Sequence, residues 1–104
     1  MTMPADRDSL IEDISTLLAS RPGRAALPRV EETLTAGYAH AMALEAEQWR
    51  LERRLRDAAD AGSESAEVSR VAEVLGAVER ELGLLRGLLA SLRDLARELR
   101  GAAV

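Results

Sequence analysis

The sequence predicts an all-α protein: an antiparallel, coiled-coil-like hairpin of two long helices, preceded by a short N-terminal helix. Composition is the first indication, because Ala, Leu, Glu and Arg dominate the 104 residues, with one Tyr, one Trp and no Phe. The second is the apolar spacing from Val68 to Leu99, which alternates between three and four residues as in a coiled-coil seam. We therefore expect a single helical domain over residues 1–104, with helices at about 6–20, 28–61 and 65–100.

The first helix is predicted from apolar residues that recur on one face, namely Leu10, Ile11, Ile14, Leu17 and Leu18. Its start is open within about one turn, because Ser9 and Glu12 resemble a capping box while Thr2-Met3-Pro4 or Asp6 offers an earlier start. Arg21-Pro22-Gly23 ends it. A helix of about fifteen residues is marginal alone, so it must dock its apolar face on another element.

The second helix is expected to begin near Pro28, with Glu31 and Glu32 meeting the positive end of its dipole. It continues without a breaker to Gly62, which is predicted to form the C-terminal cap. Gln48 is polar in an otherwise apolar or small seam, and we interpret it as fixing the register. The seam residues are Val30, Leu34, Gly37, Ala41, Leu44, Gln48, Leu51, Leu55 and Ala58.

The third helix should follow with Ser63 or Ser65 as its N-cap. Because the connection is short, the two long helices must be antiparallel, which pairs residues whose numbers add up to about 126. Small residues then face large ones, as in Gly37 against Leu89, which favours close packing. The seam residues of this helix are Val68, Val71, Leu75, Val78, Leu82, Leu85, Leu89, Leu92, Ala96 and Leu99.

Apolar residues outside these seams predict further burial. The short first helix can cover only part of them, near 34–42 and 85–95, so we expect a homodimer in which two hairpins form a four-helix bundle. The predicted interface residues are Tyr38, Met42, Trp49, Leu84, Leu88 and Leu95. A further face of the third helix is small, which indicates either close approach of another backbone or a plain solvent face; it comprises Gly76, Gly83, Gly87 and Ala90.

The net charge of −4 argues against broad binding of nucleic acid or anionic membranes. One basic segment is a possible site for an acidic partner or a phosphate, although pairs such as Glu52–Arg56 also fit a solvated helix end. Its residues are Arg50, Arg53, Arg54 and Arg56. We expect a cytoplasmic protein, because MTMPADRDSL has no apolar run of signal-peptide length and the most apolar window, Leu82–Leu95, is interrupted by charges.

His40 is the only histidine, and the chain has no cysteine, so proton-transfer or metal chemistry would have to use it. Its position resembles that of the phosphorylated His in the dimerising hairpins of sensor kinases, which usually place an acidic residue after the His, where this chain has Ala41. Glu45 and Glu47 lack the spacing that would stack them with His40 as metal ligands. We predict no enzymatic activity, no catalytic or metal site and no cofactor.

The predicted function is a non-catalytic protein–protein interaction or scaffolding module. Its partner is a second copy of the chain, and another protein is a further possibility. The alternative is a regulatory bundle that binds a small ligand in a pocket lined by Tyr38, Met42 and Leu88. A phosphotransfer domain based on His40 is a third hypothesis.

Overall fold

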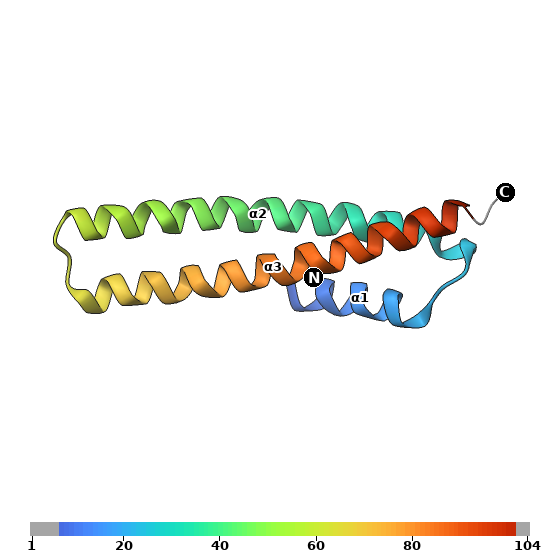
Figure 1. Cartoon of the computed structure of the whole chain (residues 1–104), viewed down its shortest axis with the longest axis horizontal. Helices are drawn as coiled ribbons and strands as arrows, with labels where there is room; N and C mark the ends of the chain where they lie inside the picture. The colour runs from blue at the N-terminus through green and yellow to red at the C-terminus, as the bar shows by residue number, and fades with distance from the viewer. Residues whose placement is uncertain (1–6, 102–104) are drawn as a thin grey trace, which may run out of the picture.

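The computed structural model describes residues 7–101, which form a helical hairpin with one additional helix (Figure 1). The elements are α1 (Arg7–Ser20), a 3₁₀ turn η1 (Arg24–Ala26), α2 (Leu27–Asp60) and α3 (Ser65–Gly101). α2 and α3 run antiparallel, and α1 lies beside the half of the hairpin remote from the α2–α3 turn (Figure 1). The molecule measures 62 × 32 × 18 Å. The predicted all-α hairpin is confirmed.

The helix ends follow the breakers in the sequence, with small differences. Position 6, the predicted start of the first helix, lies outside the described residues, and Arg7 is already helical, so Ser9 is not the N-cap. α2 has Pro28 in its first turn as predicted, but no acidic residue there. The expectation that Glu31 and Glu32 meet the dipole at the helix start is wrong, because both lie more than one turn inside the helix.

The α2–α3 turn closes α2 with a Schellman motif. Gly62 has a φ of 70°, in the left-handed region that glycine adopts without steric cost. The N–H groups of Gly62 and Ser63 donate to the carbonyls of Ala59 and Ala58, at 3.2 and 3.0 Å, and so satisfy the end of the helix. The N-cap prediction for α3 is wrong by one residue, since the Val68 N–H donates to the Glu64 carbonyl at 3.1 Å and Glu64 itself holds that position.

The predicted seam is the core of the hairpin. Its buried members are Val30, Leu34, Gly37, Ala41, Leu44, Leu51, Val71, Val78, Leu82, Leu85, Leu89, Leu92, Ala96 and Leu99. Gln48 is half-buried among them. Near the turn the seam is also only half-buried, at Leu55, Ala58, Val68 and Leu75. Every half-buried apolar seam residue therefore lies in the part of the hairpin where only two helices pack.

The register of the hairpin is fixed by a small residue under a large one. A Cβ atom on Gly37 would overlap Cδ2 of Leu89, so the Leu89 side chain occupies the space that a larger residue would need. Leu89 is only 2% exposed, which leaves it little room to move. The predicted pairing of Gly37 with Leu89 is confirmed.

α1 docks through one apolar side and turns a polar side outward. Leu10, Ile14 and Leu17 are buried and belong to the same core as the seam. The outward residues are exposed and polar, namely Ser9, Glu12, Asp13, Ser15 and Thr16. The outer surface of α1 is therefore polar and exposed to solvent.

We expect Gly37→Leu to destabilise the hairpin, because the new side chain competes with Leu89 for one buried space. Overpacking of this kind costs about 1–3 kcal/mol, more than the gain of about 1 kcal/mol from replacing a helical glycine. Chemical denaturation followed by circular dichroism measures the change in the free energy of unfolding. Adding Leu89→Ala should restore part of it. An unchanged or increased free energy of unfolding in the single variant would contradict the packing described above.

Candidate functional site

The hairpin has two broad sides, and α1 covers part of one. Near the start of α1, Leu10 and Asp13 lie beside Thr33 and Ala36 of α2. Near its end, Leu18 lines a hollow with Leu95 of α3. We call this side the covered face.

The third-helix residues predicted as an interface lie along the covered face. Leu88 and Leu95 are half-buried and pack against the core, while Leu84 is 53% exposed. α1 therefore already shields part of the apolar surface that the sequence left without a partner, as expected from its docking position. An intermolecular role for these three residues stays a prediction.

The other side of the hairpin, which we call the open face, carries the aromatic residues. Tyr38 and Met42 are 43% and 70% exposed, and Trp49, two turns after Met42 on the same side of α2, is 66% exposed. Tyr38 and Met42 border a shallow groove of about 370 Å³ between α2 and α3. The residues that line it are Tyr38, Ala41, Met42, Glu45, Arg86, Leu89, Ala90 and Arg93.

The groove differs from the pocket predicted from the sequence. Tyr38 and Met42 are brought together as expected, but Leu88 is not among the lining residues. Successive residues of a helix point about 100° apart, so Leu89 faces the seam beneath the groove, while Leu88 lies on the other side of α3. The predicted interface set thus divides into two surfaces, one on each side of the hairpin.

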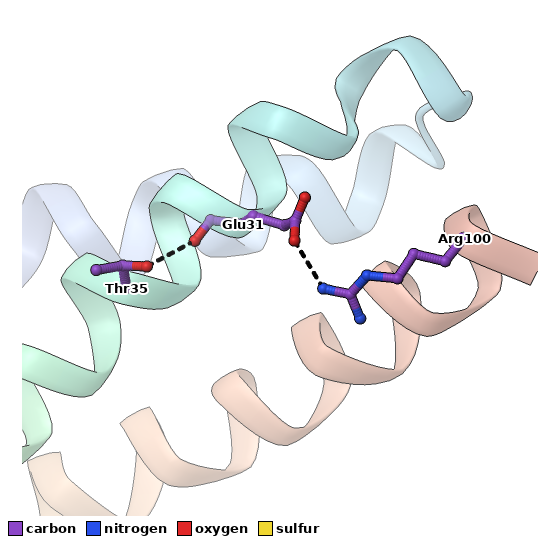
Figure 2. A network of polar contacts seen from close by, with 3 residues as sticks. All are labelled: Glu31, Thr35 and Arg100. Carbon is purple, nitrogen blue, oxygen red and sulfur yellow. Dashed lines mark hydrogen bonds and ion pairs between the residues drawn. The ribbon is translucent and has the colours of Figure 1, made fainter.

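Two ion pairs cross from α2 to α3 on the open face. Arg86 Nη2 lies 2.9 Å from Glu45 Oε1, and Arg100 Nη2 donates to Glu31 Oε2 at 2.8 Å. Figure 2 shows Glu31 reaching across to Arg100, while the Thr35 hydroxyl donates to the Glu31 carbonyl. Such exposed pairs contribute about 0–1 kcal/mol each, so they orient charges more than they stabilise the fold. The open face consequently has an acidic α2 edge and a basic α3 edge.

The basic segment of α2 is fully exposed. Arg50, Arg53, Arg54 and Arg56 spread over the outer surface of the helix, interleaved with acidic residues. Arg50 contacts Glu47 within the same helix, and Arg54 borders a groove with Glu67 and Arg70 of α3. The arginines are available to a partner, but the acidic residues among them reduce the local positive charge.

His40 makes a contact that the sequence reading missed. Its Nε2 lies 3.4 Å from Oε2 of Glu81 on α3, and the two side chains are 25% and 15% exposed. Helical position could have indicated this pair, because both residues flank the seam on the covered face, opposite the side that carries Glu45 and Arg86. Within residues 7–101, no three His, Cys, Asp or Glu side chains gather as a possible metal site.

The small residues of α3 have open space around them. A Cβ atom on Gly83 or Gly87 would meet nothing within 4 Å, and one on Gly76 would meet only the flexible end of Arg80. Packing within this chain therefore does not require these three glycines, unlike Gly37. Gly83 lies on the side of α3 that adjoins the open face, since it precedes Ala90 by two helical turns.

No family model, curated protein or solved structure matches this chain. In the part of the chain that the structure describes, no helix contains an apolar stretch of membrane-spanning length.

We expect Ile14→Ala to release α1 and uncover Leu88 and Leu95. Ile14 is 0% exposed, and truncation of such a residue costs about 2–5 kcal/mol, while a helix of this length does not persist undocked. Binding of a hydrophobic dye should increase and the free energy of unfolding should fall. Ser15→Ala, on the exposed side of α1, is the control and should change neither. Equal dye binding by all three proteins would argue against α1 as the cover.

Proposed function

We propose that this chain is a non-catalytic protein–protein interaction module whose helical hairpin assembles as a homodimer. The observation that carries the proposal is the open face, where Tyr38, Met42 and Trp49 are exposed together along one side of α2. Trp, Tyr and Met are enriched in protein–protein interfaces. Trp and Tyr bury a large apolar area while losing little side-chain entropy, and the flexible Met side chain adapts its shape to the partner.

The asymmetry between the two sides supports the same proposal. On the covered face, α1 shields apolar residues of the hairpin and presents polar side chains such as Glu12 and Thr16 to solvent. The open face has no such cover among residues 7–101. A partner there would give Met42 and Trp49 the burial that α1 gives Leu95.

A ligand-binding role is the second candidate, favoured by the groove between Tyr38 and Arg93. Its volume of about 370 Å³ falls within the range of small-molecule sites. An apolar floor at Leu89 with Arg93 at the rim would suit an amphipathic anion. The groove is shallow, so this role would require a further element to close over it.

The homodimer predicts a concentration-dependent fluorescence signal, because Trp49 is the only tryptophan in the chain. At high concentration its emission should be blue-shifted by burial, and it should move to longer wavelength on dilution. Light scattering over the same series should pass from about twice the chain mass of 11.3 kDa to the chain mass. A single chain mass and a constant emission maximum at all concentrations would contradict the dimer.

Trp49→Ala should weaken the dimer by about tenfold or more, since buried tryptophans are common hot spots. Leu84→Ala is the matched control, because Leu84 is comparably exposed but lies on the covered side. It should leave the dissociation constant nearly unchanged. If Leu84→Ala weakens the dimer and Trp49→Ala does not, the interaction surface lies on the covered face.

A further inference from the structure

The open face is complementary to itself in size. On α2 it presents two large residues, Met42 and Trp49, seven positions apart, and on α3 two small ones, Gly83 and Ala90, also seven apart. Residues seven positions apart lie on the same side of a helix, about two turns from one another. An antiparallel helix can therefore bring Met42 to Ala90 and Trp49 to Gly83 at the same time.

The open face is also complementary to itself in charge. Glu45 lies between Met42 and Trp49 on α2, while Arg86 lies between Gly83 and Ala90 on α3. Within the chain the Glu45 and Arg86 side chains meet at 2.9 Å. The α2 residues from Met42 to Trp49 and the α3 residues from Gly83 to Ala90 therefore lie at the same level along the long axis of the hairpin, which we call the rod. The α2 series is large, acidic, large, and the α3 series is small, basic, small.

We infer that a second copy of this chain packs on the open face about a two-fold axis parallel to the rod, so that α2 of each copy lies against α3 of the other. This inference rests on the proposed homodimer and specifies its geometry. An axis along the rod keeps every residue at its own level, so Trp49 meets the small surface at Gly83 of the second copy. Glu45 then lies near the Arg86 side chains of both copies.

The other face-to-face arrangement has a two-fold axis across the rod and places α2 against α2. It sets Met42 and Trp49 against equally large residues and leaves the small α3 surfaces facing each other across a void. It also opposes like charges, Glu45 to Glu45 or Arg86 to Arg86, which is unfavourable at an interface. Both size and charge therefore favour α2 against α3.

The charges also limit the length of the contact. Two helical turns closer to the α2–α3 turn, the positions equivalent to Glu45 and Arg86 are Glu52 and Glu79. Both are acidic and repel one another. In the opposite direction Tyr38 and Arg93 share the groove, and an aromatic ring beside a guanidinium is a favourable pair. The contact is centred between these two levels, around Glu45 and Arg86.

The first test places a bulky polar residue in the small surface. Gly83→Gln should raise the dissociation constant of the dimer by about tenfold or more, because it fills the space that Trp49 of the other copy needs. Gly83 has open space in the single chain, so helicity should not fall. Leu84→Gln is the control, since Leu84 is exposed next to Gly83 but lies on the covered face, and this variant should dimerise like the unmodified chain.

The second test uses cross-linking to find which residues of the two copies lie close together. The chain has no native cysteine, so only the introduced cysteines can react. A Met42→Cys chain mixed with an Ala90→Cys chain and treated with a short bis-maleimide should give a covalent dimer. Either chain alone, or Met42→Cys mixed with Ser91→Cys, should give much less, because Ser91 is exposed but points about 100° away from Ala90 around α3.

The outcomes separate this inference from the proposed homodimer. A dimer mass with Met42→Cys cross-linking mainly to itself would place α2 against α2 and overturn the arrangement while the homodimer stands. Equal dissociation constants for Gly83→Gln and the unmodified chain would also overturn it. A single chain mass at every concentration would overturn both proposals.

Discussion

The contact between Gly37 and Leu89 is the constraint on which the rest of the molecule depends. It fixes how far α2 and α3 slide along one another, because a large buried side chain occupies the only space that a missing Cβ provides. Once that register is set, Glu31 meets Arg100 and Glu45 meets Arg86 on one flank, and His40 meets Glu81 on the other. The distribution of charge and apolar surface on both sides of the hairpin follows from one steric fit in the seam.

The sequence predicted the helices, the antiparallel pairing and most of the core, because heptad spacing and the breakers at Pro22 and Gly62 are local signals that tertiary packing did not override. It did not separate the two sides of the hairpin. Tyr38 and Leu88 were assigned to one pocket, whereas they lie on opposite flanks of the seam. Apolar character alone says that a residue needs burial, but only its angular position about the helix says against which neighbour. The His40–Glu81 contact was missed for the same reason.

α1 makes the molecule two-sided. A bare hairpin would offer two similar flanks to any partner, whereas the third helix shields part of one of them and leaves the other uncovered. In the proposed homodimer, the polar outer surface of α1 would discourage further stacking on that side, so association through the open face would close after two copies instead of propagating. The short helix would therefore influence the proposed assembly although it takes no part in the interface.

The incomplete burial near the turn has a consequence for motion. Leu55, Val68 and Leu75 lie where only one other helix packs against their own, whereas Leu85 and Leu92 lie on α3 where both α1 and α2 pack against it. Local opening costs less free energy where fewer apolar contacts must be broken, so amide protons near Gly62 should exchange with solvent sooner than those beside α1. The end of the hairpin beside α1 is then more rigid than the end at the α2–α3 turn. A partner that bound near the turn would meet a surface able to adjust its shape.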